Sequence, residues 1–291
     1  MNLENPKKFA MLVEQAKQIA DNFYRPISRK YDKAEHAYPK ELDMLASLLD
    51  GMNEGSSEAT GATSASKRPS TDGDSGVRNS GNLSAALGAM ELCRGDVGLL
   101  LSIPRQGLGN AAIGAVANDE QLARFKGKWA AMAITEPSCG SDSAAIRTTA
   151  VKDGDDYILN GEKIYVTAGA RAECVVVWAT LDKSLGKAAI KSFVVEHGTP
   201  GMEITRLEHK LGIKASDTAA ILFTNCRVPA ANLLGSPEID LKKGFAGVME
   251  TFDNTRPLVA AMAVGGAPDS IERIKELLAG RGASEGGAVE E

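Results

Sequence analysis

The sequence is poor in the residues from which metal centres and disulfide scaffolds are built. Its 291 residues include only three histidines and four cysteines. The cysteines stand apart without CxxC spacing, which excludes a disulfide scaffold. The histidines are equally dispersed, so a metal site would need convergence from distant parts of the chain, and we predict none. The residues concerned are Cys93, Cys139, Cys174, Cys226, His36, His197 and His209.

The sequence also lacks a basic excess and any long apolar run. Its net charge is −5, with lysines and arginines scattered among acids, which argues against a nucleic-acid partner. No apolar run approaches the length that a bilayer requires, and the first residues lack the pattern of a signal peptide. We therefore expect a cytoplasmic protein with no membrane span.

Residues 1–130 are predicted to form an N-terminal helical domain. Asn5 and Pro6 look like the N-cap and first position of a helix that should end before Pro26. A second helix should restart at Pro39, and further helical pattern follows from residue 83. The predicted apolar face of the second helix consists of Leu42, Leu45 and Leu49.

A low-complexity stretch separates these helices. From about 53 to 82 the composition falls to Ser, Gly, Thr, Ala and Asp. Such a segment buries too little apolar surface to offset its ordering entropy. We predict a flexible loop, disordered from about Ser56 to Ser80.

Residues 131–237 are predicted to form a middle antiparallel β domain, a barrel or sandwich. Short β-branched runs separated by turn residues recur here. Two such runs flank Asn160-Gly161, a pair typical of a type I′ turn, so we place a hairpin tip there. Tyr165 and Thr167 should then share one face of the strand, with Val166 on the other.

Residues 238–291 are predicted to begin a C-terminal helical bundle. A helical pattern runs from Phe245 to Phe252, is strained at Pro257 and resumes from Ala260 to Val264. A short helix from Ser270 to Leu278 and a polar, glycine-rich tail follow. The fold class is therefore α+β, with helical regions on both sides of the β domain in sequence.

One loop has a composition suited to ligand binding. Small and hydroxyl residues from Thr135 to Asp142 allow close backbone approach and can donate N–H groups to a phosphate. Most loops of this composition are plain connections, so the loop alone is a weak signal. It opens an ordered series: Thr135-Glu136-Pro137 with Gly140-Ser141-Asp142, Lys163-Ile164-Tyr165-Val166-Thr167, Gly212-Ile213-Lys214-Ala215-Ser216-Asp217-Thr218, Val228-Pro229-Ala230-Ala231-Asn232 and Phe252-Asp253-Asn254-Thr255-Arg256-Pro257.

In this order the motifs resemble the flavin-dependent acyl-CoA dehydrogenase family, most strongly from about Ala131 to Ala263. The resemblance implies a β domain that holds FAD between two helical domains, with acyl-CoA against one face of the flavin. It also implies an oligomer, of one or of two kinds of subunit, and an electron acceptor flavoprotein as partner. The implied reaction is α,β-dehydrogenation of an acyl-CoA thioester to a trans-2-enoyl-CoA.

The resemblance assigns roles by position. Tyr165 departs from the family's usual tryptophan and keeps a smaller stacking surface. Ser141 is expected to bond the cofactor's pyrophosphate or the pantetheine of the substrate. The implied cofactor residues are Met132, Ile134, Thr135, Gly140, Ser141, Tyr165, Val166 and Thr167. The implied substrate residues are Ser141, Phe252, Asp253 and Arg256. Without the resemblance, Asp253 and Arg256 would be read as an ordinary helix-surface ion pair.

The sequence does not supply the catalytic base that the resemblance implies. The family's base is a glutamate late in the C-terminal helical domain or, in some members, one residue before the arginine of the Phe252–Arg256 helix. Thr255 occupies that second position, and a hydroxyl is a poor base at neutral pH. Glu136 and Glu250 are read as a loop residue and an exposed helix residue.

Three readings therefore stay open. In the first, the chain belongs to an active acyl-CoA dehydrogenase whose remaining domain lies elsewhere or comes from a partner. In the second, it is a non-catalytic subunit that binds FAD or acyl-CoA within a mixed oligomer. The third reading is a related acyl-CoA oxidase. Acyl length and branching are not readable from the sequence.

Overall fold

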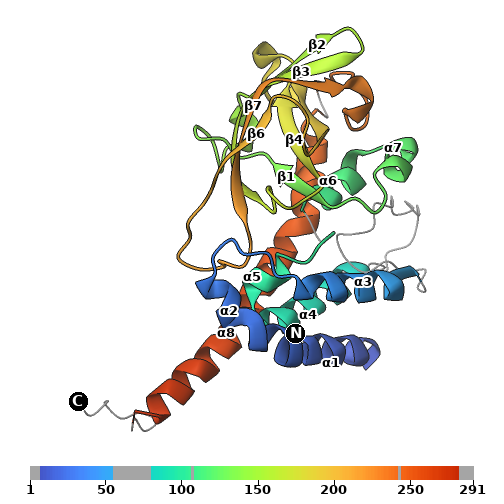
Figure 1. The fold of residues 1–291 in the computed structure, drawn as a ribbon. Helices are drawn as coiled ribbons and strands as arrows, with labels where there is room; N and C mark the ends of the chain where they lie inside the picture. Colours follow the sequence, from blue (N-terminus) through green and yellow to red (C-terminus); the bar gives the residue numbers. More distant parts are fainter. Residues whose placement is uncertain (1–6, 55–79, 106–107, 242–243, 282–291) are drawn as a thin grey trace.

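The computed structural model describes residues 7–54, 80–105, 108–241 and 244–281, and it places a group of helices beside a curled sheet (Figure 1). The N-terminal helical segments are η1 (Lys7–Phe9), α1 (Ala10–Ile19), η2 (Ala20–Tyr24), α2 (Arg25–Lys33), α3 (Glu41–Glu54), α4 (Ser80–Gly95), α5 (Val97–Leu100), α6 (Leu108–Val116) and α7 (Asp119–Arg124). The strands are β1 (Ala130–Ala133), β2 (Thr149–Asp153), β3 (Asp156–Thr167), β4 (Cys174–Thr180), β5 (Ile190–Glu196), β6 (Met202–Leu207) and β7 (Thr218–Pro229). Short helical turns η3 (Ser143–Ala145), η4 (Lys183–Ala189) and η5 (Ala230–Asn232) join the strands, and the long helix α8 (Ala246–Ala279) follows them.

The sequence predicted that the first helix ends before Pro26, but in the structure the helix continues past this residue. It continues through the π-helical turn η2 into α2, with Pro26 at the start of α2. Proline has no N–H to donate, and a π turn shifts the hydrogen-bond register so that the ring need not face an i−4 carbonyl. The helix therefore passes the proline instead of stopping there.

The helical region has its own apolar core. Leu42 and Leu45 of α3 are buried, as predicted, together with Tyr24 and Leu99. Ala215, from the loop between β6 and β7, also belongs to this cluster. The core of the helical region thus extends to a loop of the β domain. Most of the loop predicted for residues 53–82 lies outside the described residues, while helices α3 and α4 take its two ends.

The sheet follows the order β1-β4-β2-β3-β7-β6, with β5 paired to β4. Most ladders are antiparallel, as expected, but β1 pairs with β4 in parallel, and so does β2. Every residue of β4 is buried. Alternate residues of that strand enter two different apolar clusters, one with Val175 and Val177 and the other with Val176 and Trp178. A strand buried on both faces reads as a continuous apolar run, which explains its sequence.

The predicted hairpin tip at Asn160-Gly161 is wrong. Asp153 pairs with Asp156, so the turn lies at Gly154-Asp155, where Gly154 has φ 59°. Asn160 and Gly161 lie inside β3 instead. There Leu159 pairs with Cys226 and Gly161 with Phe223, which leaves one extra residue on β7.

That extra residue explains the Asn-Gly pair. Asn225 of β7 adopts a φ of 47°, and its N–H donates to Asn160 Oδ1 at 2.8 Å. Gly161 has φ 153°, and a Cβ there would collide with Thr148. Asn160 is therefore needed to complete the β-bulge, and Gly161 is needed for the close approach to Thr148. The Asn-Gly pair that results is the same sequence pattern as that of a turn.

Helix α8 is one element, although the sequence predicted a helix strained at Pro257 and a separate short helix from Ser270 to Leu278. It contains both Pro257 and Pro268. Figure 1 shows it running from the sheet past α4 and beyond the N-terminal helices. Gly265 allows close contact, because a Cβ there would collide with the Met90 backbone. Packing along α4 thus sustains the helix through two prolines. Among the described residues, no helix is long and apolar enough to cross a membrane.

Candidate functional site

The loop after β1 and the middle of β3 lie directly side by side. The N–H of Ile164 donates to the carbonyl of Thr135 at 2.9 Å. Nζ of Lys163 donates to the carbonyl of Ile134 at 3.1 Å. These two bonds fix Ile134 and Thr135 against the strand that carries Tyr165. The structure therefore brings together residues of two motifs that are about 30 positions apart in the sequence.

A buried ion pair holds this junction. Lys163 is fully buried and Glu136 is 5% exposed, and Nζ lies 2.8 Å from Oε1. The Glu136 carboxylate also accepts from the N–H of Arg147 at 2.7 Å and from the N–H and hydroxyl of Thr148 at 2.9 and 2.6 Å. A buried charge requires this many partners to offset its lost hydration.

The pair stays ionised through mutual attraction. Burial by itself would raise the pKa of Glu136, but the Lys163 charge and the hydrogen bonds from Lys163 and Thr148 outweigh it and lower that pKa. Burial lowers the pKa of Lys163, while Glu136 opposes this shift. A carboxylate with a lowered pKa and all these donors is a poor proton acceptor. Glu136 is therefore a positioning residue and not a general base.

A bulge turns Tyr165 outward. Lys163 pairs with Ile221 and Val166 with Ala219, so β3 carries one extra residue between them. Tyr165 has φ 57° and is 62% exposed, whereas Val166 is buried in the sheet core. Thr167 is half-buried and stands outside that core cluster. Val166 can therefore offer a ligand only its backbone, and its carbonyl already accepts from Gly169.

The glycine-containing loop presents small groups on the surface. Gly140 and Ser141 are exposed, and Thr135 is half-buried. A Cβ on Gly140 would lie 3.8 Å from the Thr135 methyl group, so the two residues are neighbours. Exposed hydroxyls and backbone, next to an apolar strand, suit a ligand with both a polar chain and a flat ring system.

Helix α8 reaches the other side of the same region. Phe252 packs on the apolar cluster that includes Ile134 and Met132. The Arg256 guanidinium lies over the Phe252 ring, 4.5 Å from its centroid. Asp253 is exposed. The structure thus connects Phe252 and Arg256 to the β1 residues, whereas Asp253 and Ser141 stand free at the surface.

Thr255 does not face outward with these residues. It is 4% exposed, and its hydroxyl donates to the carbonyl of Thr251 at 3.0 Å. Such back-bonding to the preceding turn is typical of a threonine inside a helix. The proton of this hydroxyl is therefore engaged within its own helix.

Sequence reasoning missed the Glu136–Lys163 pair. One signal was present, because Lys163 follows the period-two alternation of the buried Tyr157 and Leu159 along β3. A lysine there requires a buried acid as partner. Nothing local, however, identified Glu136 as that acid among the other carboxylates of the chain.

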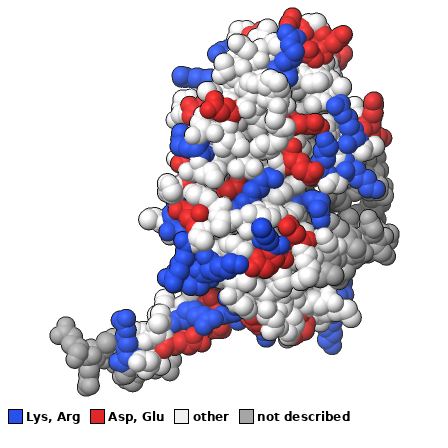
Figure 2. Space-filling model, in the orientation of Figure 1, with Lys and Arg blue, Asp and Glu red and all other residues white. Residues whose placement is uncertain are grey.

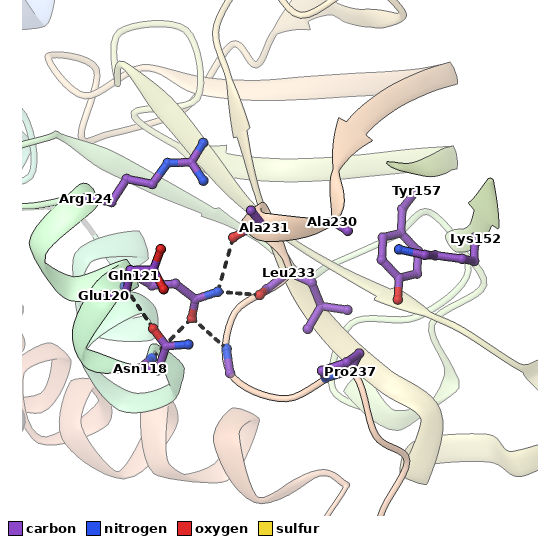
Figure 3. Close-up of a pocket in the computed structure, with 11 residues that line it drawn as sticks. Asn118, Glu120, Gln121, Arg124, Lys152, Tyr157, Ala230, Ala231, Leu233 and Pro237 are labelled. Carbon is purple, nitrogen blue, oxygen red and sulfur yellow. Dashed lines mark hydrogen bonds between the residues drawn. The ribbon is translucent and has the colours of Figure 1, made fainter. Parts of the chain in front are cut away.

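A separate cleft of about 250 Å³ lies between α7, the β2–β3 hairpin and the segment after β7. Figure 3 shows Gln121 donating across it to the carbonyls of Ala231 and Leu233, at 3.2 and 2.6 Å. None of the predicted site residues lines this cleft. Its polar groups hold the chain together, so we place the functional site at the β1–β3 junction instead.

Charges around the molecule are mixed. Figure 2 shows lysine and arginine interspersed with aspartate and glutamate over the face in view. This distribution resembles the scatter seen in the sequence and gives that face no extended basic surface.

The chain is similar to known proteins. The profile of the family described as "Acyl-CoA dehydrogenase, middle domain" matches residues 131–226. Acryloyl-CoA reductase (NADH) of Anaerotignum propionicum is 43% identical over 148 residues, which are 50% of this chain and 36% of that protein. Cyclohex-1-ene-1-carbonyl-CoA dehydrogenase of Geobacter metallireducens is 40% identical over 157 residues, 53% of this chain and 40% of that protein.

The similarity to a solved structure is more extensive. Butyryl-CoA dehydrogenase from Megasphaera elsdenii aligns with a TM-score of 0.78 at 29% identity, over 99% of this chain and 73% of the other. The alignments with the two curated relatives, in contrast, span well under half of those proteins.

Proposed function

The chain belongs to the acyl-CoA dehydrogenase family, and we propose that it binds FAD at the β1–β3 junction as part of an enzyme that dehydrogenates an acyl-CoA thioester. The observation that carries this proposal is a pair of hydrogen bonds, one from the Lys163 side chain to Ile134 and one from the Ile164 N–H to Thr135, which join the loop after β1 to the bulge presenting Tyr165. An electron acceptor flavoprotein and further subunits of the same or another kind are the partners that this proposal includes.

The residues present suit FAD. The bulge exposes an aromatic ring where its neighbours Ile164 and Val166 are buried. Tyr165 would pack on the isoalloxazine, and Thr167 would place its hydroxyl near the reactive ring nitrogen. Gly140 and Ser141 would bond the pyrophosphate through exposed backbone and hydroxyl groups. The apolar residues Met132 and Ile134 would line the ring.

The substrate would lie on the side of α8. Phe252 and Arg256 are already coupled by their cation–π contact, which holds the guanidinium in place. Arg256 and exposed Asp253 would contact the CoA part of the thioester, and Ser141 is shared between cofactor and substrate. When bound, FAD supplies the acceptor for the hydride that leaves the β-carbon of the acyl group.

The α-proton requires a base, and two residues near this region do not provide it. The Thr255 hydroxyl donates to its own helix, and the Glu136 carboxylate is held by Lys163, Arg147 and Thr148. We infer that a residue other than Thr255 and Glu136 supplies the base. Thr255 therefore favours a second candidate function, that of a subunit which binds FAD or acyl-CoA and depends on another polypeptide for proton abstraction.

Titration of FAD into the purified chain, followed by flavin fluorescence, tests the binding site. The chain alone should bind FAD weakly, because the family resemblance implies that further chain segments help to hold the cofactor. Replacing the ring in Tyr165→Ala should lower the affinity by about tenfold, since aromatic stacking contributes ~0.5–1.5 kcal/mol beyond area burial.

Val151→Ala is the matched control. Val151 is 58% exposed on β2, much like Tyr165 on β3. Its removal should leave FAD affinity unchanged. Equal affinities of wild type and Tyr165→Ala would contradict the proposed stacking. A purified chain that carries stoichiometric FAD would contradict the weak binding.

A further inference from the structure

Two histidines that are far apart in the sequence meet at the boundary between the helical region and the β domain. His36 lies in the loop after α2, and His209 lies in the loop between β6 and β7. Their ring centroids are 5.2 Å apart. Glu35 stands beside them, and its Oε2 is 2.9 Å from Nδ1 of His209. One ligand atom from each of the three residues lies within 4.8 Å of the other two.

The geometry points to a zinc site formed by Glu35, His36 and His209. Two imidazoles and one carboxylate are a usual zinc donor set, with a fourth position left for water. Tetrahedral coordination requires ligand atoms about 3.3 Å apart, given Zn–N and Zn–O bonds of about 2.0–2.2 Å. The His209 side chain is 85% exposed. It can therefore rotate to close the remaining distance.

The His36 ring, whose two nitrogens lack hydrogen-bond partners among the described residues, is the second observation that supports a zinc site. Both of its ring nitrogens are buried, and neither has a hydrogen-bond partner within the described chain. Buried polar atoms are nearly always paired, so this imidazole lacks a partner that a bound ion would supply. His36 also adopts φ 67°, a backbone conformation uncommon for a residue with a side chain. The loop is held in that conformation by Arg171, which donates to the carbonyls of His36 and Ala37 at 3.3 and 3.0 Å.

The surrounding charges permit a cation. Lys210 and Arg171 are the basic groups next to the cluster, and both are engaged. Arg171 pairs with Asp217, and Lys210 Nζ donates to the carbonyl of Ser216. Glu208 pairs with Arg206, and Glu35 contributes the carboxylate of the cluster itself.

The remaining histidine and the four cysteines of this chain are less suited to bind zinc. His197, the third histidine, hydrogen-bonds the carbonyl of Gly169 at 3.0 Å. All four cysteines are buried. Burial raises the pKa of Cys93 and of Cys174 to about 12 and that of Cys226 to about 11, which disfavours the thiolate that zinc requires. The bound ion would join the loop after α2 to the loop before β7, and so fasten the helical region to the β domain.

Calorimetric titration of the chelator-treated full chain with ZnCl₂ tests this inference. Wild type should bind one zinc per chain, and Co²⁺ in its place should give the visible absorption of a tetrahedral site. His209→Ala should weaken binding by more than the ~10–100-fold that loss of an outer partner of a metal ligand costs. Zinc should also raise the melting temperature of wild type but not that of His209→Ala.

His197→Ala is the control and should bind zinc like wild type. Because His209 is exposed, its replacement should leave the metal-free circular dichroism spectrum unchanged. Glu35→Gln changes another of the three proposed ligands and should also weaken zinc binding. It therefore tests the site independently where His36 variants fold poorly. Absence of stoichiometric zinc binding in wild type, or undiminished binding in His209→Ala, would overturn the inference.

Discussion

The buried pair of Glu136 and Lys163 makes a sharp prediction about stability. Lys163→Met keeps most of the side-chain volume and removes the charge. Glu136 then loses one of its donors but keeps the N–H groups of Arg147 and Thr148 and the Thr148 hydroxyl. The remaining carboxylate must stay charged in an apolar site or take up a proton.

The free energy of protonating Glu136 sets an upper limit to the destabilisation by Lys163→Met. Taking Glu136 from an unfolded pKa of about 4.3 to the neutral form at about pH 7 costs ~3.7 kcal/mol, at ~1.36 kcal/mol per pH unit. The three retained hydrogen bonds reduce this, so we expect ~2–3 kcal/mol for Lys163→Met. For Glu136→Gln the limit is higher, ~4.6 kcal/mol, because Lys163 would have to lose a proton from a pKa of about 10.4. Glu136→Gln should therefore be the more damaging change.

Urea unfolding followed by circular dichroism measures both variants. Lys187→Met, at an exposed lysine in η4, is the matched control and should stay within ~0.5 kcal/mol of wild type. The double variant should be less destabilised than the sum of the single variants by at least ~1 kcal/mol. If Lys163→Met behaved like Lys187→Met, or if the two changes were additive, the pair would not hold the junction.

Three further outcomes are expected. Gly161→Ala should destabilise the fold by about 1–3 kcal/mol, because the new Cβ collides with Thr148. Gly212→Ala is the control and should be neutral, because a Cβ there meets open space. Equal unfolding midpoints of the two variants would contradict the close approach of Gly161 to Thr148. Hydrogen bonds from Lys30 and Tyr31 lower the pKa of Glu41 to about 2. The stability it provides should be present above the unfolded pKa and lost as pH falls from about 4.5 to about 2, so Glu41→Gln should flatten the stability–pH profile in that window. The FAD-loaded chain alone should not dehydrogenate acyl-CoA, and rapid anaerobic bleaching of its flavin by acyl-CoA thioesters would reveal a base not identified above.

Local patterns predicted local structure well. Helix α3 buries Leu42 and Leu45 because their spacing puts them on one face. Val166 lies in the core and Tyr165 outside it, but there the bulge against β7 sets the faces, not a simple alternation. Along α3, in contrast, a residue's burial depends on its near neighbours in the chain. The periodicity of the sequence records those neighbours directly.

The errors arose where distant residues decide. Asn160-Gly161 satisfies a turn rule, yet pairing with β7 converts it into a bulge that Asn225 completes. Pro257 should strain a helix, yet contact along α4 maintains α8 through it. The proximity of His36 and His209 was likewise not readable from local spacing, because only the packing of two separate loops brings them together.

Arg171 shows how this long-range packing bears on the candidate site. It follows β3, the strand of Tyr165 and Thr167, and donates to Ala37 in the helical region and to Ala215 in the loop before β7, at 3.0 and 2.9 Å. Its ion-pair partner Asp217 accepts from the N–H of Ala170 at 2.8 Å. The planar guanidinium can serve these acceptors at once, which a lysine ammonium cannot do with fixed geometry. The segment that presents Tyr165 is therefore fixed before this residue by Lys163 and Glu136 and after it by Arg171. A flat ligand bound as proposed would meet a preorganised surface there, so less of its binding free energy would be spent on ordering the protein.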